Sequence, residues 1–134
     1  MNIIFLLKTK SELAYLYSDE TFAAGMEKLL SSGYSAIPVI DREGGYVGSV
    51  REGDFLRRLA EGDSAPSALA DLPIAQILRS DFIPAVQVDA QLGELLTMAQ
   101  NQNFIPVVDG RGAFIGIVTR KDILQYYYAQ MQEG

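Results

Sequence analysis

Two short segments of the chain carry charged side chains, joined in one of them by a hydroxyl, at a spacing suited to binding a phosphorylated sugar. The segments are Thr119-Arg120-Lys121-Asp122 and Arg51-Glu52-Gly53-Asp54. Each follows an apolar run and opens a run with helical periodicity, so it lies at a helix start, where free N–H groups stabilise a phosphate. Thr119 can donate a hydroxyl hydrogen bond, and Asp122 offers two acceptor oxygens to two vicinal ribose hydroxyls. Arg120 and Lys121 add positive charge on the phosphate side.

The same spacing also has a purely structural interpretation. Thr119 and Asp122 match a capping box, in which the Thr caps the helix and the acid bonds back to the cap. Arg51 cannot accept a backbone N–H, which predicts that Asp54 is not half of a capping box. Favourable charge near a helix start would also place an acid there. Contact with a ligand is the alternative that would explain both Asp54 and Asp122.

Arg51 sets the earlier segment apart from the later one. Its cation could bind a more highly charged phosphate or a second type of ligand, or it could fill the site by pairing with a nearby acid. We expect the segment around Thr119 and Asp122 to be the competent one.

The two segments lie at the ends of a repeat. Residues Ile37–Leu56 and Ile105–Leu124 align without a gap at an offset of 68 residues, and nine of the 20 positions are identical. The identical pairs are Ile37/Ile105, Pro38/Pro106, Val39/Val107, Asp41/Asp109, Gly44/Gly112, Gly48/Gly116, Val50/Val118, Asp54/Asp122 and Leu56/Leu124. A duplicated unit of this length in 134 residues predicts two pseudo-equivalent halves that share their apolar faces.

Each half is predicted to run strand–helix–strand–strand–helix, which makes the chain a mixed α/β (α+β) protein. Hydrophobic periodicity and turn residues predict the elements. In the first half these are Leu13–Tyr17, a helix from Phe22 to about Leu30, Ala36–Ile40, Tyr46–Val50 and Asp54–Ala60; in the second they are Ile83–Val88, a helix from Leu92 to Ala99, Phe104–Val108, Ala113–Val118 and a helix from about Arg120 to Gln130. Ile3–Leu7 is expected to be a short strand or entry segment, and Leu72–Leu78 a short helix. We place the first unit, with the N-terminal segment, at residues 1–62, and the linker with the second unit at residues 63–134.

Composition excludes several classes of function. The chain has no Cys and no His, which removes disulfides, thiol nucleophiles, thiolate metal sites and the commonest general base. The net charge of −6 argues against nucleic acid and anionic membranes as partners. No apolar run reaches the length of a transmembrane span, and the short apolar start does not resemble a signal peptide. We therefore expect a cytoplasmic protein without catalytic residues and without a metal site.

The order of elements and the motif residues resemble a tandem pair of CBS domains, known as a Bateman module. The resemblance covers about Ser11 to Tyr128 and rests on a strand ending in Ile-Pro-Val-[Ile/Val]-Asp, a glycine turn, a second strand, and a helix that opens with an Asp. Residues 116–122, Gly-Ile-Val-Thr-Arg-Lys-Asp, match the family's nucleotide-binding pattern. The resemblance implies two clefts related by a pseudo-twofold axis that bind AMP, ADP, ATP, S-adenosylmethionine or cyclic di-AMP.

The resemblance also implies roles for particular residues. The Asp bonds the ribose, the Ser or Thr lies near the phosphate, apolar residues around the repeated proline enclose the adenine, and the segment before the second half's first strand supplies backbone contacts to the base. On this sequence the implied site comprises Thr119, Arg120, Lys121, Asp122, Ile83, Pro84, Ala85, Phe104, Ile105 and Pro106, and, in the first half, Ala36, Ile37, Pro38, Arg51 and Asp54. Core packing explains the apolar members equally well, and strand ends tolerate proline.

We expect a stand-alone regulatory sensor whose adenine nucleotide is a regulatory ligand rather than a cofactor, with the output passed to a separate effector protein. The chain ends soon after the second motif, which motivates this expectation. A homodimer is expected because Tyr126, Tyr127 and Tyr128 cannot all face one core at 100° per helical residue, and because CBS pairs commonly pack through their helices. The alternatives are a ligand-free interaction module and a small enzyme acting on nucleotides.

Overall fold

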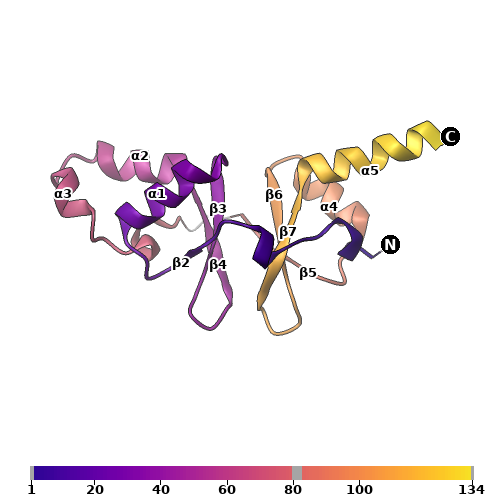
Figure 1. The fold of residues 1–134 in the computed structure, drawn as a ribbon, viewed down its shortest axis with the longest axis horizontal. Coiled ribbons are helices and arrows are strands. Elements are labelled where there is room, and N and C mark those ends of the chain that lie inside the picture. Colours follow the sequence, from indigo (N-terminus) through magenta and orange to yellow (C-terminus); the bar gives the residue numbers. More distant parts are fainter. Residues whose placement is uncertain (1, 80–82, 134) are drawn as a thin grey trace. The chain divides into compact units, whose positions relative to one another are not determined.

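The computed structural model describes residues 2–79 and 83–133 as two compact units (Figure 1). The continuous unit is Ala14–Phe82, and the composite unit combines Met1–Leu13 with Ile83–Gly134. The N-terminal segment therefore packs with the second repeat, whereas the predicted division at residues 1–62 and 63–134 grouped it with the first. No helix in the described part of the chain is long and apolar enough to cross a membrane.

The continuous unit is a three-stranded sheet with its helices. Its elements are β2 (Leu16–Tyr17), α1 (Phe22–Ser32), β3 (Ala36–Ile40), β4 (Tyr46–Arg51), α2 (Glu52–Ala60), α3 (Pro66–Leu69) and the 3-10 helix η3 (Ile74–Ile77). The strand order is β2-β3-β4, with β2 parallel and β4 antiparallel to β3. Gly33 ends α1 at a φ of 78°, a left-handed conformation that glycine adopts without strain.

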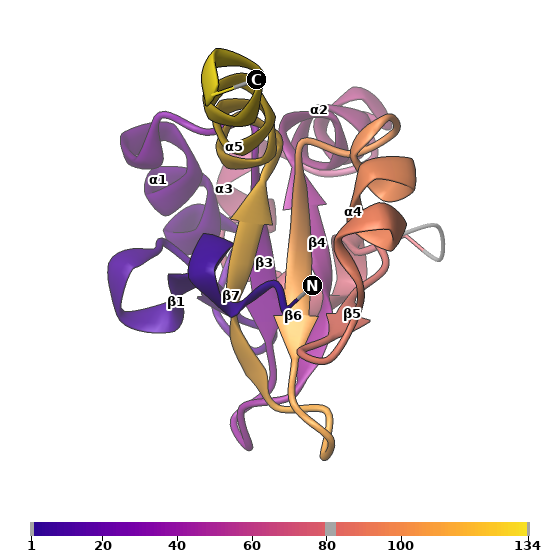
Figure 2. The ribbon, with the colours of Figure 1, turned by 90° about the vertical axis from the view of Figure 1, so that its right-hand side faces the viewer.

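The composite unit repeats this plan and adds one strand from the start of the chain. Its elements are the 3-10 helices η1 (Ile4–Leu6) and η2 (Lys10–Glu12), β1 (Lys8–Thr9), β5 (Val86–Gln87), α4 (Leu92–Ala99), β6 (Phe104–Val108), β7 (Phe114–Thr119) and α5 (Arg120–Glu133). The strand order is β1-β7-β6-β5, and Figure 2 shows α5 continuing from the end of β7. β1 pairs antiparallel with β7, which explains why residues 1–13 belong to this unit.

Equivalent strand positions form the two hydrophobic cores. They are Ile37, Val39 and Val50 in the continuous unit and Ile105, Val107 and Val118 in the composite unit, each at most 1% exposed. In the continuous unit, Phe22 of α1 and Phe55 of α2 meet edge to face with ring centroids 5.0 Å apart. The alternation of a strand places the residues between these positions on the opposite face of each sheet.

Both hairpins are closed by the repeated Asp. Asp41 Oδ1 accepts hydrogen bonds from the N–H groups of Glu43 and Gly45, each at 2.9 Å. Asp109 Oδ1 accepts from Arg111 and Ala113 at 2.8 and 3.0 Å. These two backbone donors hold the pKa of Asp109 below its usual range. Two of the nine identical pairs therefore have turn-forming roles, since Gly44 and Gly112 also take positive φ values of 93° and 83°.

The predicted order of elements in each half is confirmed, and the differences concern the bounds and types of short elements. Both first strands are shorter than predicted, because only two residues of each pair with the next strand. The N-terminal segment forms a 3-10 turn at Ile4–Leu6 rather than a strand, and the strand follows it. The helix predicted at Leu72–Leu78 is the 3-10 helix Ile74–Ile77, preceded by Pro73.

Candidate functional site

In the composite unit, four segments meet at the edge of the sheet where β7 ends. Phe104 at the start of β6 pairs with Thr119 at the end of β7. β5 runs parallel to β6, so the residues before β5, Ile83–Ala85, lie toward the same edge. β1 runs antiparallel to β7, with Lys8 opposite Ile117, so the residues before β1 also lead there. The topology therefore brings Thr119, Phe104 and Ile83–Ala85 toward one edge of the sheet, together with the N-terminal segment.

The start of α5 is fixed by two backbone hydrogen bonds. The N–H of Asp122 donates to Thr119 Oγ1 at 3.1 Å, so Thr119 caps the helix as the structural interpretation required. The N–H of Arg120 donates to the carbonyl of Asn103 at 3.1 Å, and its guanidinium also reaches the Asn103 side chain at 3.1 Å. The hydroxyl hydrogen of Thr119 is not used in capping and can still be donated.

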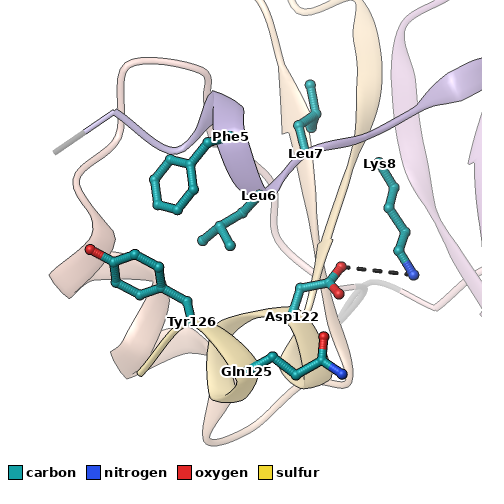
Figure 3. Close-up of a pocket in the computed structure, with 7 residues that line it drawn as sticks. All are labelled: Phe5, Leu6, Leu7, Lys8, Asp122, Gln125 and Tyr126. Carbon is teal, nitrogen blue, oxygen red and sulfur yellow. Dashed lines mark ion pairs between the residues drawn. The ribbon is translucent and has the colours of Figure 1, made fainter. Parts of the chain in front are cut away.

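The carboxylate of Asp122 faces a hollow between α5 and the N-terminal segment. The hollow has a volume of about 440 Å³ and is lined by Phe5, Leu6, Leu7, Lys8, Asp122, Gln125 and Tyr126 (Figure 3). The ammonium of Lys8 lies 3.8 Å from Asp122 Oδ2, and the Asp122 side chain is 23% exposed. Asp122 is thus a partly exposed acid with one cation beside it at the rim of a hollow of ligand size.

The equivalent acid of the continuous unit is closed off. The side chain of Asp54 is 2% exposed, and its Oδ2 accepts the backbone N–H of Arg51 at 2.8 Å. Arg57 donates to Oδ1 at 3.1 Å and also bonds the carbonyl of Ile77 at 3.2 Å. The prediction that Asp54 takes no part in capping is therefore wrong: the reverse half of a capping box needs only the backbone N–H of the first residue, which Arg51 has.

Arg51 pairs only weakly with Asp54, since its Nε lies 4.0 Å from Oδ2. Its Nη2 is buried without a hydrogen-bond partner within the described residues. The non-core face of β4 carries further polar groups, because the hydroxyls of Tyr46 and Ser49 hydrogen-bond at 2.7 Å. Burial raises the pKa of Tyr46 well above its usual range. At the equivalent positions β7 carries Phe114 and Ile117.

The apolar candidates divide between the two faces of each sheet. Ile37 and Ile105 belong to the hydrophobic cores, and this packing explains them without a ligand. Ala36, Pro38, Phe104 and Pro106 alternate with them and so face the opposite side. Pro38 and Pro106 lie opposite Ser49 and Ile117 in their hairpins.

Three residues at this edge were missed by the sequence reasoning. Gln102 donates its amide hydrogens to the carbonyls of Pro84 and Phe104, at 3.2 and 3.0 Å, and so joins the segment before β5 to the start of β6. Asn103 anchors the first turn of α5, and Lys8 faces Asp122 from the other end of the chain. The polar pair Gln102-Asn103 directly before a buried strand was the available signal for the first two. Among the described residues, no group of three or more acidic side chains gathers to hold a metal ion.

Known proteins share this arrangement. A family model described as "CBS domain" matches residues 7–61 and 74–129. A solved CBS domain protein from Streptococcus pneumoniae is 30% identical, with a TM-score of 0.85 over 95% of this chain and 86% of its own. CbpB, solved in complex with c-di-AMP, has a TM-score of 0.92 over 99% of this chain and 88% of its own, and at 24% identity it shows a shared fold.

Curated relatives are longer than this chain. An uncharacterized protein of Methanopyrus kandleri, MK0525, is 26% identical over 79% of this chain and 55% of its own length. The chain spans between 25% and 55% of the first curated relatives that it matches. Both halves are covered by the family model, and the repeated sheet-and-helix plan agrees with it, so the chain belongs to the CBS domain family as a tandem pair of CBS domains.

Proposed function

We propose that this CBS pair is a regulatory module that binds an adenosine nucleotide at the start of α5. Asp122 contacts the ribose hydroxyls, and Thr119 with Arg120 and Lys121 lies on the phosphate side. The carrying observation is that Asp122 is partly exposed on a hollow of about 440 Å³ and keeps acceptor capacity beyond its ion pair with Lys8. A carboxylate in this position can accept two vicinal hydroxyls.

The base is proposed to lie against the segment before β5 and the non-core face of β6. Ile83, Pro84, Ala85, Phe104 and Pro106 come to the same edge of the sheet as Thr119. Ile105, which points into the core, supports this wall from behind. That CbpB was solved with c-di-AMP on this fold supports an adenosine nucleotide as the class of ligand.

The continuous unit is proposed to contribute little to ligand binding. Asp54 already satisfies Arg57 and the N–H of Arg51, and it is almost fully buried. Opening this site would require separating a buried carboxylate from its cation, which is costly. Arg51, Asp54, Ala36, Ile37 and Pro38 are therefore assigned to the structure of this unit.

Ligand occupancy is proposed to act on an effector protein through a shift between conformations of a homodimer. Exposed apolar side chains on the helices support self-association. Leu56 of α2 and Leu124 of α5, an identical pair of the repeat, are 64% and 69% exposed, and Tyr128 is 64% exposed. Of the three consecutive tyrosines, Tyr128 is the exposed one, which agrees with the expectation that they cannot all face one core. A homodimer is expected to melt at a temperature that rises with protein concentration.

Titration with a panel of ligands tests the proposal. AMP, ATP and cyclic di-AMP are each added to the intact chain, with thermal melting and calorimetry as readouts, and at least one is expected to raise the melting temperature by mass action. Absence of any shift at millimolar concentration favours a ligand-free interaction module instead. Turnover of a nucleotide that Asp122→Ala abolishes would assign the chain to enzymes.

A further inference from the structure

The N-terminal segment reaches the start of α5 because β7 contains a glycine. A Cβ added at Gly116 would collide with the backbone carbonyl of Lys8. Lys8 and Thr9 lie opposite Ile117 and Gly116 in the sheet, so β1 can pair this closely with β7 only with a glycine there. Gly116 of the motif therefore allows the residues of β1 and η1 to lie against α5.

This close approach places a cation beside the proposed ribose contact. Lys8 Nζ lies 3.8 Å from Asp122 Oδ2, with the Lys8 side chain 40% exposed. Figure 3 shows the ammonium directed toward Asp122, on the opposite side of the hollow from Phe5 and Tyr126. An ammonium has three donors, and one contact to Asp122 leaves donors for a second acceptor.

The pairing of Lys8 with Asp122 has little value for stability. Both side chains are partly exposed, and water screens the attraction between ions in such positions. Lys8 makes no other ion pair within the described residues. A cation held next to a sugar-binding carboxylate can serve a group that is bonded to that sugar, and in a nucleotide this group is the phosphate.

We propose that Lys8 joins Arg120 and Lys121 on the phosphate side of the ligand site, and that it selects anionic adenosine nucleotides over adenosine and over the cationic S-adenosylmethionine. This inference rests on the proposed function. Lys8 and the capped start of α5 together supply the positive charge that a phosphate needs. The same ammonium repels a sulfonium and gains nothing from an uncharged nucleoside.

Calorimetry with three ligands and three variants tests the selection. AMP, adenosine and S-adenosylmethionine are titrated into the intact chain, Lys8→Met, Lys8→Arg and the control Lys10→Met, which alters a lysine outside the hollow. Lys8→Met is expected to weaken AMP about 10- to 100-fold, as for the loss of a charge-assisted hydrogen bond. It should change the affinity for adenosine by no more than about twofold, since adenosine lacks the phosphate that accepts this hydrogen bond. Lys8→Arg should retain most of the AMP affinity, and Lys10→Met should match the intact chain.

The outcomes separate this inference from the function on which it rests. If the intact chain binds none of AMP, ATP and cyclic di-AMP, the proposed function itself fails. If the intact chain binds AMP and Lys8→Met binds it equally well, only the role of Lys8 is overturned. An equal loss for AMP and adenosine would show that Lys8 acts through Asp122 or through the fold. Tighter adenosine binding by Lys8→Met would show that Lys8 competes with the ligand. Added salt should weaken AMP binding by the intact chain more than adenosine binding.

Discussion

The helix starts of the two repeats carry the same Asp in two different states. At the start of α2, Asp54 is 2% exposed and holds Arg57 and the N–H of Arg51. At the start of α5, Asp122 is 23% exposed and faces a hollow with Lys8 beside it. The position equivalent to Arg57 is Gln125, which lines that hollow. An identical residue in a repeat therefore does not imply an identical role, because its neighbours one helical turn away decide whether its oxygens are available.

The capping hydrogen bonds differ in the same way. In α5 the side chain of Thr119 accepts from the N–H of Asp122, and in α2 the side chain of Asp54 accepts from the N–H of Arg51. Each helix start thus uses one half of a capping box. The capping hydrogen bond of α5 does not involve the carboxylate of Asp122, whereas that of α2 is accepted by the carboxylate of Asp54.

The largest effect should be the loss of stability on removing Asp54, the buried acid. Asp54→Ala leaves Arg57 and a backbone N–H without their buried partner, and we expect it to lower the free energy of unfolding by about 3 kcal/mol. Denaturant unfolding measures this. Asp122→Ala is the matched control and should lose less than about 1 kcal/mol, because its carboxylate is partly exposed. Equal losses for the two variants would remove the distinction between them.

Removing Asp122, the partly exposed acid, should weaken ligand binding. Asp122→Ala is expected to weaken an adenosine nucleotide by about 1–3 kcal/mol through lost hydrogen bonds, while the fold stays intact. Calorimetry gives the affinity, and Asp89→Ala, an exposed acid of the same unit, is the control. Unchanged affinity in Asp122→Ala would overturn the ribose assignment.

Pairing Asp122 with an added arginine should also weaken ligand binding, but to a smaller extent. Gln125→Arg gives Asp122 an arginine at the spacing by which Arg57 holds Asp54. We expect this pair to compete with the ribose hydroxyls and to weaken the nucleotide by about 1 kcal/mol, the scale of one exposed ion pair. Gln125→Met, which adds no charge, separates pairing from altered shape. Tighter binding by Gln125→Arg would instead point to a phosphate contact by the new cation.

Converting the cap of α2 should have a still smaller effect. Arg51→Thr supplies a side-chain oxygen for the N–H of Asp54, and we expect it to stabilise the chain by about 0.5–1 kcal/mol. The number of bound ligands should not change, because Arg57 still holds Asp54. A second bound ligand in Arg51→Thr would show that Arg51 alone blocks the first site.

The smallest expected effect concerns a feature that the two units share, the hairpin Asp. The folded-state pKa of Asp109 is lowered by its two backbone donors, so its contribution to stability is present above the unfolded-state pKa and is lost as the pH falls through the folded-state value. Unfolding of the intact chain between pH 6 and about pH 3 should therefore show a larger loss than that of Asp109→Asn, whose amide keeps an acceptor without titrating. Identical pH profiles would contradict this role.

The sequence predicted the repeated plan because hydrophobic periodicity and turn glycines are local signals. The strands Ala36–Ile40 and Phe104–Val108 match their predicted bounds. The N-terminal segment was placed with the wrong unit, because a two-residue strand has no periodicity and its partner lies far along the chain.

The candidate site was predictable only in part for the same reason. Thr119 and Asp122 carry a motif, and the structure brings them to one edge with Phe104 and Ile83–Ala85. The closing of Asp54 depends on Arg57 reaching both that carboxylate and the carbonyl of Ile77, which no spacing rule reveals. Lys8 carries no motif, and only the pairing of β1 with β7 places it at the site.

The pairing of β1 with β7 also sets an order of assembly. The strands of the continuous unit follow one another along the chain, so they can pair as soon as that stretch has been synthesised. β1 is synthesised before the continuous unit but has to wait for β7, and closing so long a loop is slow relative to local contacts. The residues of β1 are thus made before the continuous unit but are fixed in place after it. Lys8 is one of them, so the charge proposed to select the ligand reaches its place only after β7 has been made.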